Sequence, residues 1–285
     1  MSSAAPGSPP PRTPVALTIA GSDSGGGAGI QADLKAFARC GVHGTSAITA
    51  ITAQNTVGVS AVHTVPPEIV LAQVRAVVSD LGVDAVKVGM LGTAEVTLAV
   101  AAALDELPAG TPVVVDPVMV AESGASLLAS DARDTLVREI LPRASVLTPN
   151  LPEARALVGG EPAGEGDEDA EAESLARALL ALGPRIVVLT GGHRARAVDL
   201  FVDSAGDGRA VEIEGERHPG GAAHGSGCTH ASVLAAQLAL GHDPLDAART
   251  ARRIAGEAVA AGLRGLGAGA GPVDVLQIAG RRGNR

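Results

Sequence analysis

A short segment towards the end of the chain combines residue types that suit phosphate chemistry. It reads His-Gly-Ser-Gly-Cys from His224 to Cys228, and an alanine-rich stretch with the composition of a helix follows. The first amides of a helix lack internal partners and carry the positive end of its dipole, so an anion can bind there. A cysteine in that turn would feel the same field, which favours its thiolate. Cys228 is therefore our first catalytic candidate; the alternative is an ordinary loop with a small buried cysteine.

A second glycine-rich loop covers residues 21–29, between a buried strand expected at 15–20 and a helix expected at 30–40. A strand, a glycine-rich turn and a helix are the ingredients of a nucleotide-binding unit. Isoleucine replaces the third glycine of the dinucleotide pattern, however, and no Walker lysine follows. We interpret the loop as a close backbone approach to a small ligand, with Asp33 as a polar contact. A surface turn with a solvated aspartate is the alternative.

Side-chain amides occur at two further places. Gln54 closes a β-prone run at residues 46–53, and an amide offers a heterocycle both a donor and an acceptor, although such residues also favour turns. Asn150 and Glu153 lie three residues apart at a turn into a helix. This pair could orient a hydrated Mg²⁺ beside phosphates. It could equally cap the helix, with Asn150 as the N-cap.

The elements that must position these residues alternate along the chain. Further strands are expected at residues 85–88, 113–115, 145–147 and 186–189, with helices at 68–81, 94–107, 174–182 and 246–261. Alternating strands and helices predict a mostly parallel α/β sheet with helices on both faces, and ligands collect beyond the carboxyl ends of its strands. Residues 198–202 and 210–213 are expected to close the sheet as an antiparallel pair. Gly21, Gln54, Met90 and Asp116 all fall at expected strand ends, which predicts one shared site.

Composition excludes several classes of protein. The chain has 285 residues, a formal net charge of −9 and only two aromatic residues, Phe37 and Phe201. It offers neither stacking platforms nor positive charge for nucleic acid. The cysteine usage fits a reducing cytoplasm, and we expect neither a signal peptide nor a membrane span. We expect one domain at residues 15–278, with a disordered Pro/Ser-rich tail at 1–14, a C-terminal tail at 279–285 and a solvated acidic insertion at 163–173.

The motifs together resemble a known family. In chain order they are ALTIAGSD (16–23), GGAGIQADLK (26–35), AQNT (53–56), KVGML (87–91), DPVM (116–119), TPNLPE (148–153) and HGSGCT (224–229). This series closely resembles the hydroxymethylpyrimidine and phosphomethylpyrimidine kinases of thiamine biosynthesis, in the ribokinase-like superfamily. The resemblance covers residues 15–275, and an ordered series is far more specific than any single motif.

The resemblance implies a ribokinase-like three-layer sandwich that uses ATP and Mg²⁺. It also implies a homodimer. It implies phosphorylation of 4-amino-5-hydroxymethyl-2-methylpyrimidine and then of its monophosphate. Gln54 would hold the aminopyrimidine, Gly21, Met90 and Val118 would shape the pocket, and Asp33 would lie near the reacting end. Gly225, Ser226, Gly227 and Cys228 would surround the transferred phosphoryl group, with Cys228 where the superfamily usually carries an aspartate base. Asn150, Thr190, Gly192 and His224 would contact ATP and its phosphates, and Glu153 and Asp116 would serve the metal.

Two positions depart from the family pattern. Members often carry lysine where this chain has Glu122 and Thr190, which would weaken the electrostatic clamping of phosphates unless Arg194 or Arg196 compensates. Two rival functions therefore stay open. One is a pyridoxal kinase of the same superfamily, and the other is a pyrimidine-binding or regulatory protein that has lost catalysis.

Overall fold

An eight-stranded sheet forms the centre of the computed structural model, which describes residues 12–120, 124, 130–159, 168–193, 196–206 and 209–280. Within the sheet only β9 runs antiparallel to its neighbours, β8 and β10, and the remaining pairs are parallel. This confirms the mostly parallel sheet and the closing antiparallel pair. The order is β10-β9-β8-β7-β6-β5-β1-β2, with β1 (Val15–Ala20), β2 (His43–Ile48), β5 (Ala85–Val88), β6 (Val113–Val115), β7 (Val146–Leu147), β8 (Ile186–Leu189), β9 (Val198–Asp203) and β10 (Val211–Glu214).

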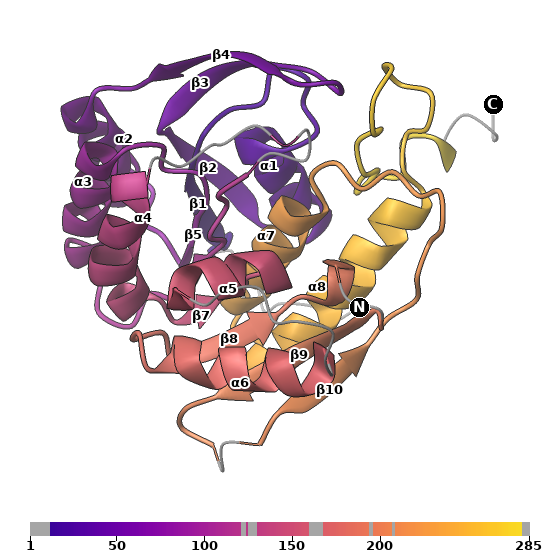
Figure 1. Cartoon of the computed structure of the whole chain (residues 1–285). Coiled ribbons are helices and arrows are strands. Elements are labelled where there is room, and N and C mark those ends of the chain that lie inside the picture. The colour runs from indigo at the N-terminus through magenta and orange to yellow at the C-terminus, as the bar shows by residue number, and fades with distance from the viewer. Residues whose placement is uncertain are drawn as a thin grey trace, which may run out of the picture.

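Helices cover both faces of this sheet, as Figure 1 shows, so the predicted three-layer α/β sandwich is confirmed. The central strands are continuous buried runs of aliphatic residues, as expected for parallel strands covered on both sides. One face carries α2 (Pro67–Asp80), α3 (Ala94–Asp105), α4 (Ser130–Thr135) with the π-helical turn Leu136–Ile140 and the 3₁₀ turn Leu141–Arg143, α5 (Leu151–Val158) and α6 (Glu168–Leu180). The other carries α1 (Gly29–Arg39), α7 (Ser226–Ala239) and α8 (Pro244–Ala260).

Small side chains bring α7 into the middle of its layer. Ala231, Ala235 and Ala236 are fully buried there. A helix with alanines on several faces can pack closely against the sheet and two neighbouring helices, and α7 contacts both α1 and α8. This packing fixes the start of α7, where the predicted anion-binding turn lies, against the carboxyl edge of the sheet.

The β-prone run at residues 46–53 is two strands rather than the expected one. After β2, the fully buried Thr49 donates its amide to Ala20 and its hydroxyl to the Met90 carbonyl, which directs the chain out of the main sheet. β3 (Ala50–Gln54) then pairs with β4 (Val59–Thr64) in a separate two-stranded hairpin, visible at the top of Figure 1. Gln54 therefore does not end a strand of the main sheet. β4 was not predicted, because its residues are largely exposed and lack an apolar alternation.

The acidic run begins a helix earlier than predicted. α6 starts at Glu168 rather than Ser174, because acidic side chains in a first helical turn interact favourably with the helix dipole. The rest of the run, residues 163–167, lies outside the described residues, as do 1–11 and 281–285. The domain limits at 15 and 278 therefore stay predictions. No helix in the described part of the chain has the length and apolar character needed to cross a membrane.

Candidate active site

A cavity of about 160 Å³ lies where the parallel strands end. Gly21 follows β1, Asp116 follows β6, and Met90, Thr148 and Thr190 lie just beyond β5, β7 and β8. These residues share the cavity because parallel strands present their carboxyl ends at one edge of a sheet. The hairpin supplies Gln54 and the start of α7 closes the other side. The remaining predicted members that line it are Val118, Asn150, Glu153, His224, Gly225, Ser226, Gly227 and Cys228.

The turn before α7 is built around Gly225, which has a φ of 85°. A Cβ at this position would lie 1.8 Å from the Gly27 carbonyl oxygen, so only glycine fits both the conformation and the space. The Ser226 amide is occupied by the Ala223 carbonyl at 3.0 Å, and the first helical bond runs from Thr229 to Gly225. The amides of Gly227 and Cys228 thus precede the helix's own pairing and suit an anion.

Cys228 does not carry the lowered pKa that the sequence favoured. Burial raises the pKa of its thiol to about 12, although the positive charge of Lys87 opposes this. The negative charges of Asp116 and Asp33 add to the rise. Loss of hydration at the thiol therefore outweighs the helix field, and Cys228 is a protonated thiol at neutral pH.

Lys87 is a site residue that the sequence reasoning missed. Its Nζ lies 3.1 Å from Oδ1 of Asp33 and 3.4 Å from Oδ2 of Asp116, in a place closed to solvent. Burial works to lower the pKa of Lys87, but Asp33, Cys228 and Asp116 outweigh it and raise that pKa. The available signal was a lysine inside the apolar strand Ala85–Val88, at a position that had to be buried.

Asp33 does not line the cavity, contrary to the prediction that it contacts the ligand. Its carboxylate accepts hydrogen bonds of 2.6 Å from the hydroxyls of Thr18 and Ser232 and pairs with Lys87. The side chain points inward because α1 packs against β1 on that face. Asp33 therefore supports Lys87 from beneath the cavity.

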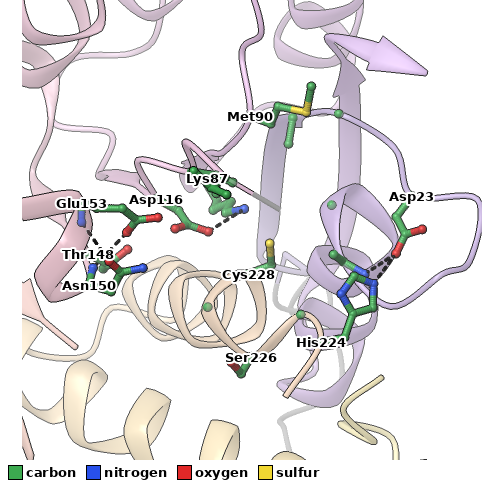
Figure 2. A pocket seen from close by; sticks show the side chains of 18 of the residues that line it. Asp23, Lys87, Met90, Asp116, Thr148, Asn150, Glu153, His224, Ser226 and Cys228 are labelled. Carbon is green, nitrogen blue, oxygen red and sulfur yellow. Dashed lines mark hydrogen bonds and ion pairs between the residues drawn. The ribbon is translucent and has the colours of Figure 1, made fainter. Parts of the chain in front are cut away.

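The carboxyl groups of Asp116 and Glu153 lie near each other, to the left of Lys87 in Figure 2. Burial raises the pKa of Asp116, and burial together with the charge of Asp116 raises the pKa of Glu153 to about 8. Glu153 also accepts the Asn150 amide at 2.9 Å, and the Asn150 side chain accepts the Glu153 amide at 2.9 Å. The capping arrangement considered for this pair is thus present, and it leaves one Glu153 oxygen for another contact.

Asp23 is the second residue that sequence reasoning missed, and it changes the interpretation of the first glycine loop. Its carboxylate accepts the amides of Gly25, Gly27 and Ala28, so these amides are closed to a ligand. It also lies 2.9 Å from Nε2 of His224, on the opposite side of Cys228 from Lys87 in Figure 2. Burial works to raise the pKa of Asp23, but these hydrogen bonds lower it overall. His224 therefore pairs with Asp23 through Nε2, and its contact with a phosphate stays a prediction.

A second cavity of about 300 Å³ adjoins the first across Thr190, Ala223, Ser226 and Gly227. The predicted phosphate-side residue Gly192 lines it, together with Gly191, Asp199, His230 and Arg252. The start of α7 therefore lies at the boundary between the two cavities.

Arg196, one of the two expected replacements for the missing lysines, lines neither cavity. Arg196 is exposed and forms ion pairs with Asp169 and Glu212, so it does not compensate. Arg194 and Glu122 lie outside the described residues. Within the described part of the chain, no group of three or more His, Cys, Asp and Glu side chains could hold a metal unaided.

The chain is similar to proteins of known activity. The Phosphomethylpyrimidine kinase family profile matches residues 23–274. A Hydroxymethylpyrimidine/phosphomethylpyrimidine kinase from Streptomyces coelicolor is 47% identical over 93% of this chain and 96% of its own. The crystal structure of phosphomethylpyrimidine kinase from Clostridium difficile 630 has a TM-score of 0.72 at 38% identity, over 84% of this chain and 96% of its own. An ADP complex of Bacillus subtilis pyridoxal kinase has a TM-score of 0.80 at 34% identity, and the match covers 94% of this chain and 99% of that one.

Proposed function

This chain belongs to the phosphomethylpyrimidine kinase family, and from that premise we propose that the two adjoining cavities are its acceptor site and its nucleotide site. The chain is a hydroxymethylpyrimidine/phosphomethylpyrimidine kinase of thiamine biosynthesis, and the family uses ATP. Pyridoxal kinases are neighbours in structure only. The observation that carries the proposal is the start of α7, whose unpaired amides lie at the boundary between the cavities.

The first cavity is proposed to take the pyrimidine. Gln54 at its rim offers a donor and an acceptor to the aminopyrimidine edge. Gly21 and Met90 would shape a flat slot, since a Cβ on Gly21 would lie 3.0 Å from the Met90 sulfur. Val118 adds an apolar wall beside them. The hydroxymethyl group would then point towards Cys228 and Lys87.

The second cavity is proposed to take ATP. Thr190 and Gly192 would contact the phosphates, with Asn150 near the shared boundary. The amides of Gly227 and Cys228 would receive the transferred phosphoryl group, where negative charge develops in the transition state. Fixed amides suit this step, because phosphoryl transfer needs positioning and charge stabilisation more than covalent help.

Cys228 is proposed to matter chiefly in the first phosphorylation. That step requires removal of a proton from an alcohol. Cys228 can accept this proton only as a thiolate, which forms when the thiol releases its own proton to water beside the Lys87 ammonium. The raised pKa of about 12 makes that release costly. The second substrate presents a phosphate that is already ionised and needs no base. Lys87, with its charge fixed by Asp33, would attract the acceptor oxygen in both steps.

Glu153 and Asp116 fit a Mg²⁺ ion, and we assign the metal of the reaction to them. Both carboxyl groups are buried, Oδ2 of Asp116 faces the Lys87 ammonium at 3.4 Å, and the charge of Asp116 contributes to the raised pKa of Glu153. Such a pair gains most from a cation, and Mg²⁺ is commonly bound through one or two carboxylates together with substrate phosphates. When bound, Mg²⁺ neutralises charge on the phosphates during transfer.

A homodimer is proposed as the assembly. The hairpin exposes Ile51, Val57 and Val62, which are 53%, 60% and 49% accessible. Exposed apolar side chains on a two-stranded hairpin are open to burial by another protein chain, and we propose a second copy of this chain. Light scattering after size-exclusion chromatography measures this directly, and a monomer at micromolar concentration would contradict it.

One assay tests the proposed site. Purified protein is supplied with ATP, Mg²⁺ and either hydroxymethylpyrimidine, its monophosphate or pyridoxal, and products are identified by mass. We expect the pyrimidine pyrophosphate from both pyrimidines. Transfer to pyridoxal alone would favour the rival kinase, and binding of pyrimidine without any transfer would favour the regulatory function.

A further inference from the structure

A buried charged cluster borders the second cavity and has no role in the assignments above. It joins Asp199 on β9, His230 on α7 and Arg252 on α8, whose side chains are 0%, 5% and 14% exposed. Nε2 of His230 lies 3.0 Å from Oδ2 of Asp199, and a guanidinium nitrogen of Arg252 lies 3.7 Å from Oδ1. All three residues line the cavity.

The carboxylate of this cluster holds the segment that was assigned to the phosphates. Oδ1 of Asp199 accepts the Gly191 amide at 2.8 Å. A Cβ on Gly191 would lie 2.3 Å from the Val198 carbonyl oxygen, so this backbone is pressed against β9. The other end is fixed by the Thr190 amide, which donates to the Pro149 carbonyl at 2.8 Å. Thr190 and Gly191 are thus anchored at two points.

The cluster does not resemble a purely structural network. Burial works to raise the pKa of Asp199, but His230 and Arg252 lower it overall, so the carboxylate stays ionised. Nε2 of His230 faces Asp199, whereas within the described residues Nδ1 of His230 and Nε of Arg252 have no hydrogen-bond partner. Buried polar groups are nearly always satisfied, so these two nitrogens, on residues that line the second cavity, are available to a polar ligand there.

The helix geometry separates this cluster from the acceptor. Residues two positions apart on an α-helix point in nearly opposite directions. Cys228 accordingly lines the first cavity and His230 the second. Asp199 lines the second cavity and not the first, so a change at Asp199 acts first on the nucleotide side of α7.

We propose that Asp199 is a positioning residue for the nucleotide. Its carboxylate, oriented by His230 and Arg252, fixes the Gly191 amide and so places the backbone from Thr190 to Gly192 against the phosphates of ATP. This inference rests on the proposed placement of ATP in the second cavity.

The test compares Asp199→Ala and Asp199→Asn with the matched control Asp203→Asn. Asp203 is on the same strand, accepts the Ala205 amide and lines neither cavity. Asp199→Ala removes the acceptor of a charge-assisted hydrogen bond, so KM for ATP should rise about tenfold or more. Asp199→Asn keeps an oxygen for Gly191 and should recover most of that loss. KM for the pyrimidine and both KM values of Asp203→Asn should stay unchanged. Titration calorimetry with ADP measures binding without turnover, and it should rank the affinities of the wild type and the variants in the same order as the KM values for ATP.

Three outcomes would overturn the inference: unchanged ADP affinity in Asp199→Ala, equal losses for both substrates, or no recovery in Asp199→Asn. If Asp199→Ala fails to fold by circular dichroism, His230→Gln takes its place, and unchanged ADP affinity in that variant refutes the orienting role. Wild-type protein that transfers no phosphoryl group would refute the proposed function instead. Active wild-type protein with insensitive variants refutes only the role of Asp199.

Discussion

The ammonium nitrogen of Lys87 lies 3.1 Å from Oδ1 of Asp33, and neither side chain has any exposed surface. Asp116 is the second anion of this group, at 3.4 Å. A cation held between two buried acids cannot be removed without leaving charge that has no partner. The group therefore links the stability of the fold to the charge of the active site.

Lys87→Met should destabilise the protein strongly. Removing one partner of a buried ion pair costs about 3–5 kcal/mol, because the remaining carboxylates stay buried without their cation. Urea unfolding followed by circular dichroism measures this. Lys35→Met is the control, since Lys35 is only partly buried and donates to a backbone carbonyl. Equal unfolding free energies for the two variants would show that Lys87 does not hold the group together.

Cys228→Ala should slow the first phosphorylation more than the second. A positioned base contributes about 10²–10⁴-fold, and only the alcohol substrate needs one. Separate kcat values on hydroxymethylpyrimidine and on its monophosphate decide the matter. Cys40→Ala, at the other cysteine, should leave both unchanged. Equal losses on the two substrates in Cys228→Ala would rule out the base.

Glu153 should make the metal-free protein less stable as pH rises. Its pKa is raised from 4.5 to about 8 in the folded state, so the folded protein binds a proton that the unfolded chain releases. The resulting stabilisation is complete below pH 4.5 and is lost as pH rises through about 8. Melting temperatures without Mg²⁺ should fall across this range, and Glu153→Gln should reduce the slope. A Glu153→Gln profile that matches the wild type would exclude this group as the cause.

Gly225→Ala should abolish activity, because the new Cβ would overlap the Gly27 carbonyl at 1.8 Å. Gly241→Ala is the matched control, since Gly241 has a φ of 80° and open space around its Cβ position. Both variants carry the strain of a left-handed residue, about 1–2 kcal/mol. Only Gly225→Ala should also lose phosphoryl transfer in a protein that remains folded at assay temperature. An active Gly225→Ala variant would show that the loops around Gly27 and Gly225 can move apart without loss of phosphoryl transfer.

The sequence predicted the architecture well because apolar strand runs and alternating helices are local signals. The bounds of β1, β5, β6 and β8 were predicted without error, and Gly21, Met90 and Asp116 met at one edge as topology required. The turn that opens α7 was likewise recognisable from a glycine pair before a helix.

What could not be predicted depended on contacts between distant segments. Asp23 and His224 are 201 positions apart, and Lys87 lies 54 positions from Asp33. The pKa of Cys228 was misjudged because burial depends on the packing of several elements, whereas the helix field is visible in the sequence. The hairpin was missed because Thr49 diverts the chain through contacts with Ala20 and Met90 that no local pattern encodes.

That hairpin has a consequence for how acceptor preference can change over evolutionary time. In the described part of the chain β3 and β4 pair only with each other, yet they carry Gln54, the proposed reader of the acceptor ring. The groups proposed for phosphoryl transfer are anchored in the main sheet and α7 instead. Substitutions in the hairpin can therefore change which acceptor is bound, while the residues proposed for phosphoryl transfer stay the same.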